Sequence, residues 1–236
     1  MSGPMANHRK GDPAAILEGF WRDAQARGVQ RCSLFVVPPF HSASADTAQQ
    51  FWWGYHPDWI AHYFEKRAAH RDEVPDYVID GGKTILWADA IKMVHQTEEN
   101  QALKATFFSY HRNDAVSAPL YGPNGNNALL TFSFGIDLES ADNPRVKEIV
   151  DLSSRAFANY ILNFQRHEAA ATPLSPRELE IIALSAKGQS NKELARTLGI
   201  SPSSVDTYMR RIFAKLEVTD RVQAVLQCLS MGLVRL

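Results

Sequence analysis

Several features that would mark particular protein classes are scarce in this 236-residue chain. Its only two cysteines, Cys32 and Cys228, lie far apart among apolar neighbours, so we expect buried free thiols and neither a disulfide nor a metal pair. No apolar run approaches the roughly 20 residues that span a bilayer, and the first residues, MSGPMANHRKGDP, do not contain the apolar core of a signal peptide. We therefore expect a cytoplasmic location and no membrane partner.

Net charge is also nearly absent, with a formal value of −1, so the overall composition does not point to nucleic acid. The charge is unevenly distributed, however. Residues 174–236 contain nine Lys and Arg against six Asp and Glu, or +3, which leaves −4 for the residues before them. There is no internal repeat or low-complexity tract, and 45% of the residues are hydrophobic. The chain is long enough for two globular domains, one of them mildly basic.

Three helix-start signals lie in residues 174–236. SPRE at 175–178 and SNKE at 190–193 are both capping boxes, and SP at 201–202 opens a third helix that we expect to span 202–216. Between the second and third helices is LGI at 198–200, where glycine tolerates the positive φ of a tight turn. This pattern predicts a helix-turn-helix.

The same segment resembles the LuxR-type (NarL/FixJ-like) helix-turn-helix domain. The resemblance is carried by LSPRELE, GQSNKELA, LGISPSSV and KLEVTDRVQAV, and it spans nearly all of residues 174–236. Apolar residues recur at the helical spacing that a compact four-helix core requires. They are Ile181, Ile182, Leu184, Leu194, Ala195, Leu198, Val205, Ile212, Leu216, Ala224, Val225 and Leu229.

The resemblance implies binding to double-stranded DNA, with the third helix in the major groove. Residues in the first turns of a recognition helix meet base edges, whereas basic residues further along reach phosphates. We therefore expect base contacts from Ser203, Ser204 and Thr207, and phosphate contacts from Lys192, Arg210, Arg211 and Lys215.

The residues before this segment predict a mixed fold. Helices are expected at 13–28, 57–67, 98–111 and 144–166, and strands at 33–37, 84–87, 116–120 and 127–134, with GPNG at 122–125 as a hairpin turn. Helices placed before, between and after an antiparallel sheet favour an α-β-α sandwich, a shape that often encloses a small-molecule cavity. The expected fold class is therefore α+β: a sandwich at 1–166, a linker at 167–173 and an all-α four-helix domain at 174–236.

Nine aromatic residues crowd into residues 51–87. An aromatic core would explain them, but Tyr hydroxyls and Trp N–H groups need partners when buried, and Asp72 is a potential acceptor beside them. Tyr55, Trp59, Tyr63, Asp72 and Trp87 are spaced as in the autoinducer-binding domain of LuxR-type quorum-sensing regulators, which read N-acyl-homoserine lactones.

This second resemblance implies roles for individual residues. Trp59 would donate its indole N–H to the lactone carbonyl, Tyr55 its hydroxyl to the amide carbonyl, and Asp72 would accept from the amide N–H. Tyr63 and Trp87 would form the pocket walls. Thr131, on the strand after the hairpin, would help to read a substituent on the acyl chain.

Three positions depart from the family pattern. Glu73 follows Asp72 where the family usually has proline, which leaves the Asp72 loop less pre-set, and Ala115 replaces a glycine, so its methyl group would narrow the pocket or fix a different loop. On the third helix, Asp206 stands where a basic or polar residue is common. It either faces away from DNA, pairs with Arg210, or accepts from a cytosine amino group.

Together the resemblances imply a ligand-responsive transcriptional regulator of quorum sensing. It would bind an acyl-homoserine lactone and, as a homodimer, a palindromic operator, and it would be no enzyme and need no cofactor or metal. Dimer contacts are expected on the long helix and on the last one, although core packing explains the same residues equally well. They are Val146, Ile149, Val150, Ala156, Phe157 and Tyr160, with Val225 and Leu229.

Other functions fit the residues less well. A phosphorylated response regulator shares the C-terminal domain but needs a receiver with an acidic pair and a phosphoacceptor Asp, and residues 1–140 do not show that pattern. A metal hydrolase would use His56, His62 and His70 with Asp72, yet no H-x-x-x-H or C-x-x-C spacing occurs. A LuxR solo that senses a non-lactone molecule, or an inhibitory heterodimer partner, remains the main alternative.

Overall fold

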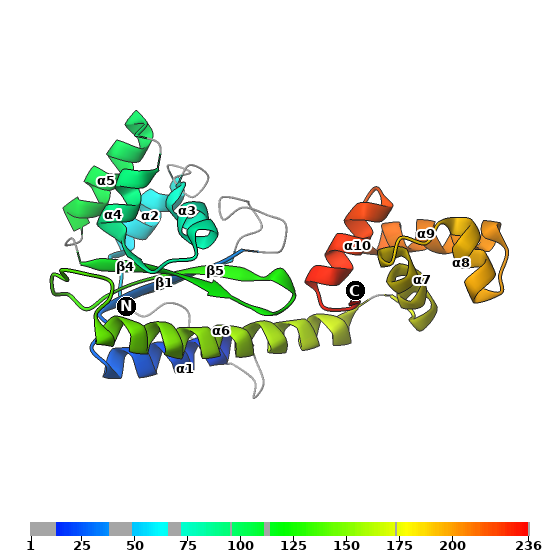
Figure 1. The fold of residues 1–236 in the computed structure, drawn as a ribbon, viewed down its shortest axis with the longest axis horizontal. Helices are drawn as coiled ribbons and strands as arrows, with labels where there is room; N and C mark the ends of the chain where they lie inside the picture. Colours follow the sequence, from blue (N-terminus) through cyan, green and yellow to red (C-terminus); the bar gives the residue numbers. More distant parts are fainter. Residues whose placement is uncertain are drawn as a thin grey trace. The chain divides into compact units, whose positions relative to one another are not determined.

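The computed structural model describes residues 13–37, 49–65, 72–94, 96–110, 114–172 and 174–235. The chain divides into two compact units, Met1–Ile161 and Leu162–Leu236. The first is built on a sheet and the second is helical (Figure 1). Among the described residues, no helix combines the length and apolarity needed to cross a membrane.

A five-stranded antiparallel sheet forms the centre of the first unit, with strand order β2-β1-β5-β4-β3. The β4–β5 connection is the predicted hairpin: the Gly122 amide donates to the Asn126 carbonyl at 2.7 Å, and Asn124 adopts φ 57°. The strands are β1 (Arg31–Val37), β2 (Gln49–Trp53), β3 (Ile85–Leu86), β4 (Ala115–Tyr121) and β5 (Asn127–Ser133), and the 3-10 turn η2 spans Pro123–Gly125.

Helices cover both faces of this sheet, so the predicted α-β-α sandwich is confirmed (Figure 1). Side chains alternate along β1, with Cys32 and Leu34 in the core beneath one helical layer and Phe35 in the core beneath the other. One layer consists of α1 (Pro13–Ala26) and α6 (Pro144–Ala171), and the other of α2 (Pro57–Glu65), α3 (Val74–Gly81), α4 (Trp87–Met93) and α5 (Glu98–Tyr110).

Three of these elements were not predicted. Strand β2 was missed because its Gln-Gln start and three consecutive aromatics do not alternate in polarity. The short helices α3 and α4 were missed because seven or eight residues show too little periodicity, and Trp87, expected to end a strand, begins α4 instead.

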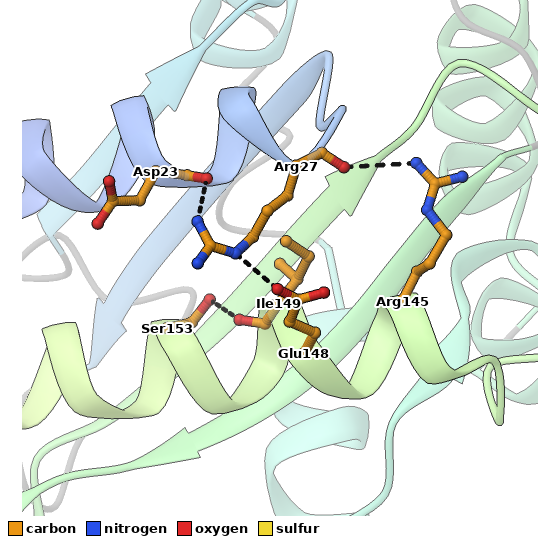
Figure 2. A network of polar contacts seen from close by, with 6 residues as sticks. All are labelled: Asp23, Arg27, Arg145, Glu148, Ile149 and Ser153. Atoms are coloured by element: carbon orange, nitrogen blue, oxygen red, sulfur yellow. Dashed lines mark hydrogen bonds and ion pairs between the residues drawn. The ribbon is translucent and has the colours of Figure 1, made fainter.

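Polar contacts fasten the end of α1 to the start of α6 (Figure 2). Arg27 donates from Nε to Glu148 Oε1 at 2.7 Å and from Nη1 to the Asp23 carbonyl at 2.8 Å, while Arg145 Nη2 lies 3.4 Å from the Arg27 carbonyl. The groups are exposed, so the Arg27–Glu148 ion pair contributes little free energy. Their role is to give carbonyls at the end of α1 hydrogen-bond partners.

Helix α6 corrects two expectations. It continues to Ala171, because the sequence HEAAA at 167–171 favours helix, so most of the expected linker is helical. In addition, Val146, Ile149, Phe157 and Tyr160 are at most 4% exposed and pack into the core with α1 and the sheet, so they are not available as a dimer surface.

The second unit contains the predicted helix-turn-helix. Both capping boxes form, at Ser175 with Glu178 and at Ser190 with Glu193, and Gly199 ends α8 with φ 62°. Val205, Ile212 and other predicted core residues are buried between the helices. The helices are α7 (Pro176–Ala186), α8 (Asn191–Leu198), α9 (Pro202–Leu216) and α10 (Arg221–Ser230).

Candidate functional site

A small cavity lies between the sheet and the layer of α2 to α5, and all six residues expected to bind ligand line it. Trp59 and Tyr63 come from one face of α2, while Thr131 reaches the cavity from β5. The cavity encloses about 30 Å³, far less than the 300 to 1,000 Å³ typical of ligand pockets. The lining residues are Ser33, Phe35, Trp52, Tyr55, Trp59, Tyr63, Asp72, Trp87, Phe107, Leu129 and Thr131.

Asp72 is the charged group of this lining, and its carboxylate is held by two hydrogen bonds. Tyr63 donates its hydroxyl to Oδ2 at 2.9 Å, and the Val74 amide donates to Oδ1 at 3.0 Å. The hydrogen bond from Val74 fixes Asp72 at the start of α3. We expected the loop to be less rigid because Glu73 replaces a proline, but Pro75 in the first turn of α3 restricts the backbone instead. Burial raises the pKa of Asp72 to about 6 despite both bonds.

The two tyrosines of the cavity remain protonated donors at neutral pH. Burial raises the pKa of Tyr63, and the neighbouring Asp72 carboxylate raises it further. Burial also raises the pKa of Tyr55, against the smaller opposing effect of a hydrogen bond with Ser33. The cavity thus presents phenolic hydroxyls and a carboxylate within an apolar shell.

Aromatic rings fill most of the space around these polar groups. Phe107 of α5 packs edge-on against Trp59, at 5.2 Å between ring centroids, and lies 4.2 Å from Trp87. Trp52 packs against Tyr55 and Tyr63, and its indole nitrogen is buried without a hydrogen-bond partner in the described part of the chain.

Sequence reasoning missed several of the lining residues. Ser33 and Phe35 lie at alternate positions of β1 and therefore on one face of the sheet, which the predicted strand at 33–37 already implied. Trp52 was one of the nine clustered aromatics but was not predicted to bind ligand. Thr131 shares a hydrogen bond of 3.0 Å with Ser117 on β4. Ala115 is buried in the same core cluster as the aromatic lining but is not itself one of the lining residues.

No metal site accompanies the cavity in the part of the chain that is described. No group of three His, Cys, Asp or Glu side chains there is placed to hold an ion. His56 and His62 lie on or beside α2, and His70 falls outside the described residues.

On the helix-turn-helix unit, most of the residues expected to meet DNA are accessible. Ser203, Arg210 and Arg211 on α9 are exposed, as is Lys192 on α8. Ser204 and Thr207 are half-buried, and their hydroxyls bond within the helix start: Ser204 with Ser201 Oγ at 2.8 Å, and Thr207 with the Ser203 carbonyl at 2.9 Å.

Lys215 on α9 has an ionic partner within its own unit. Its Nζ lies 2.7 Å from Oε2 of Glu178, whose side chain is 3% exposed, so the ammonium is the counter-ion of a buried carboxylate. Burial opposes the charge of Glu178, but hydrogen bonds from Lys215 and Ser175 outweigh it and lower the pKa of Glu178. This ion pair joins α7 to α9, and we expect it to take the place of the phosphate contact predicted for Lys215.

Comparison with known families decides what this arrangement represents. The autoinducer binding domain family matches residues 12–161, and the family of bacterial regulatory proteins of the luxR type matches residues 172–228. The chain belongs to the LuxR family of autoinducer-binding transcriptional regulators. Both resemblances stated from the sequence are thereby confirmed.

Individual relatives share parts of this family architecture. The transcriptional regulatory protein MctR of Rhizobium johnstonii is 37% identical over 70 residues, 30% of this chain and 33% of its own length. The HTH-type regulator y4qH of Sinorhizobium fredii is 23% identical over 158 residues, which are 66% of this chain and 48% of y4qH. The response regulator VraR of Staphylococcus aureus is 44% identical over 62 residues, which are 26% of this chain and 30% of VraR. The chain spans a third to a half of the length of these curated relatives.

Solved structures show the fold over nearly the whole chain. Escherichia coli SdiA superposes with a TM-score of 0.69 at 18% identity, covering 96% of this chain and 93% of SdiA. SdiA in complex with octanoyl-rac-glycerol gives a TM-score of 0.68 at 18% identity, with 98% and 92% covered. At this identity the likeness concerns the fold alone.

Burial of Asp72 predicts a pH dependence of folding. A carboxyl whose folded pKa is raised to about 6 stabilises the protein fully below its unfolded pKa near 4, and that contribution disappears as pH rises through 6. Urea unfolding without ligand should show Asp72→Asn gaining about 1 to 2 kcal/mol relative to wild type between pH 5 and pH 7.5. Parallel pH profiles for the two proteins would contradict a raised pKa.

The Lys215 ion pair predicts a stability effect and no effect on phosphate contacts. Lys215→Met leaves the buried Glu178 carboxylate without its cation but with its bonds to Ser175, and should cost about 1 to 3 kcal/mol at pH 7. Because the pKa of Glu178 is lowered, the loss should shrink as pH falls below the unfolded pKa near 4.5.

Arg211→Met is the matched control on the same helix. It should reduce the salt slope of DNA binding by about one without lowering stability, whereas Lys215→Met should leave the slope unchanged. A reduced slope for Lys215→Met in a salt titration would restore Lys215 to the phosphate contacts.

Proposed function

We propose that this chain is a quorum-sensing regulator that binds an N-acyl-homoserine lactone in the cavity of its first unit. The domains would be residues 1–166 for ligand and 174–236 for DNA. The observation that carries the proposal is the single cavity shared by Tyr55, Trp59, Tyr63, Asp72, Trp87 and Thr131.

The chemistry of the cavity matches the head group. An acyl-homoserine lactone has a lactone carbonyl and an amide carbonyl as acceptors and one amide N–H as donor. The Asp72 carboxylate is an acceptor, while the Trp59 indole and the Tyr55 hydroxyl are donors, so each polar group of the ligand has a counterpart. Groups of this kind, set among aromatic rings, are the usual composition of a small-molecule site.

The small volume makes ligand binding and folding linked processes. A ligand of this size requires aromatic side chains such as Phe107 and Trp52 to move outward, so the ligand becomes part of the core. A ligand that binds only the folded state stabilises it by about 2.7 kcal/mol at one hundred times Kd. We therefore propose that the signal molecule acts by stabilising the first unit.

The main alternative for the ligand is an amphiphile without a lactone ring, and one observation supports this alternative. SdiA, which shares the fold, has been seen in complex with octanoyl-rac-glycerol. An acylglycerol has hydroxyl donors in place of the amide N–H, and these also match Asp72. Octanoyl-homoserine lactone and octanoyl-rac-glycerol carry the same acyl chain, so a comparison of the two isolates the head group.

The test is calorimetry of the full chain with both compounds. Octanoyl-homoserine lactone should bind more tightly, and Trp59→Phe or Asp72→Asn should weaken its binding by roughly 10- to 150-fold, the value of one hydrogen bond involving a charged or desolvated group. Tyr121→Phe, which removes a hydroxyl bonded to the Ile79 carbonyl outside the cavity lining, should bind like wild type. Tighter binding of the acylglycerol would establish the alternative, and unchanged affinity in both cavity variants would remove them from the site.

We further propose that the chain binds a palindromic operator as a homodimer, because one short recognition helix contacts too few bases for useful specificity. Because four of the six α6 residues expected at the dimer contact are buried in the core, the contact is proposed on α10. Val222, Val225 and Leu229 share one face of that helix at positions i, i+3 and i+7, and Val222 is 65% exposed.

A charge at this face tests the dimer. Val222→Asp should shift the DNA-bound chain from two copies to one in light scattering, because a dimer would bury the carboxylate, and should weaken DNA binding at least 10-fold. Val222→Ala is the conservative control and should remain dimeric. A wild-type chain that binds a single half-site as a monomer with full affinity would contradict the proposal.

A further inference from the structure

Asp206 is the residue of α9 that the family resemblance does not account for. It is exposed, and its Oδ1 accepts a hydrogen bond of 2.6 Å from Nδ2 of Asn191 on α8. Arg210 does not form an ion pair with this carboxylate; its Nε lies 3.4 Å from the Asp206 backbone carbonyl. The carboxylate is therefore held toward α8, on the side of the unit where the two helices of the motif meet.

The partner of Asp206 is itself fixed in orientation. Arg221, at the start of α10, donates from Nη2 to Oδ1 of Asn191 and from Nη1 to the Gln189 carbonyl at 3.0 Å. A guanidinium has donors only, so the Asn191 oxygen must face Arg221 and its amide nitrogen must face Asp206. A relay of side chains from three helices thus sets the position of one exposed carboxylate.

This carboxylate retains acceptor capacity. A carboxylate offers about four lone-pair positions, and Asn191 uses one of them. Ser203 and Arg210, three residues before and four residues after Asp206, lie on the same helical face and are exposed. The acceptor therefore sits on the surface where the recognition helix is proposed to meet DNA.

The chemistry of DNA narrows what such an acceptor can contact. Phosphates repel a carboxylate, so the available partners are the amino groups on base edges in the major groove. Adenine places the N7 acceptor beside its amino group, and N7 would face the carboxylate unfavourably. Cytosine presents its N4 amino group as a donor alone, which makes it the matching partner.

We propose that Asp206 is a base-reading residue that accepts a hydrogen bond from a cytosine amino group, so that each half-site requires a C·G pair at one position. Asn191 and Arg221 are positioning residues that hold the carboxylate for this contact. The inference rests on the proposed DNA-binding function and adds a specificity determinant to it.

The test is selection of bound duplexes from a random-sequence library by the full chain, with and without octanoyl-homoserine lactone. The wild-type chain should enrich a motif with a C at one position of each half-site. Asp206→Ala should lose preference at that position alone, by about 5- to 150-fold, the discrimination of one good base contact. Its affinity for random DNA should be equal or higher, because a negative charge facing the phosphates is removed.

Three further variants separate base reading from general electrostatics. Asp206→Asn keeps the shape but presents both an acceptor and a donor, the pair that matches adenine, so the preference should move from C toward A. Glu217→Gln removes one exposed carboxylate from the far end of the same helix and should leave the motif intact. Asn191→Ala should weaken the preference at the Asp206 position, since the carboxylate loses its tether.

Other results would overturn the inference. An unchanged motif with uniformly weaker binding for Asp206→Ala and Asp206→Asn would show that Asp206 only ties α9 to α8. The wild-type chain could also enrich a motif in which no position shows a C preference that is lost on substitution of Asp206. That result would overturn the base-reading role of Asp206 but not the proposed regulator function. A wild-type chain that enriches no sequence would overturn the proposed DNA binding and this inference with it.

Discussion

The burial of one carboxylate among aromatic rings is the constraint around which the first unit is organised. An ionised group away from water is costly unless hydrogen bonds compensate it, and Asp72 receives one from Tyr63 and one from the first turn of α3. Those two bonds fix the ring of Tyr63 and the start of α3. They do not fully offset the burial, because the pKa of Asp72 remains raised. The unit thus keeps an acceptor that is only partly satisfied, which a complementary donor can complete.

The buried carboxylate of the second unit, Glu178, has a different set of partners. Glu178 is also almost fully buried, but a capping box and the Lys215 ammonium satisfy it, and its pKa is lowered. The contrast separates a structural acid from the acid that we propose to bind ligand. For Glu178 the hydrogen bonds and the counter-ion lower the pKa more than burial raises it, whereas for Asp72 burial raises the pKa more than the hydrogen bonds lower it.

The sequence predicted much of this because several signals are local. Capping boxes fixed the starts of α7 and α8, the GPNG turn predicted the β4–β5 hairpin, and the spacing of Trp59 and Tyr63 placed both on one face of α2. What it did not predict depends on partners distant in the chain. The ion pair of Lys215 is formed with Glu178, 37 residues away. The hydrogen bonds that hold Asp206 come from Asn191 and, through it, from Arg221, on two other helices. Strand β2 likewise depends on pairing with β1 and not on its own pattern.

The two capping boxes also differ in how freely they can vary over evolution. Both read Ser-x-x-Glu and cap their helices in the same way, but Glu193 is exposed whereas Glu178 is buried against Lys215. Glutamine serves a capping box nearly as well as glutamate, so position 193 is free to drift by itself. At position 178, loss of the charge would leave an ammonium without its counter-ion. Among descendants of this chain, positions 178 and 215 should therefore covary, although they belong to different helices and only one of them belongs to the motif.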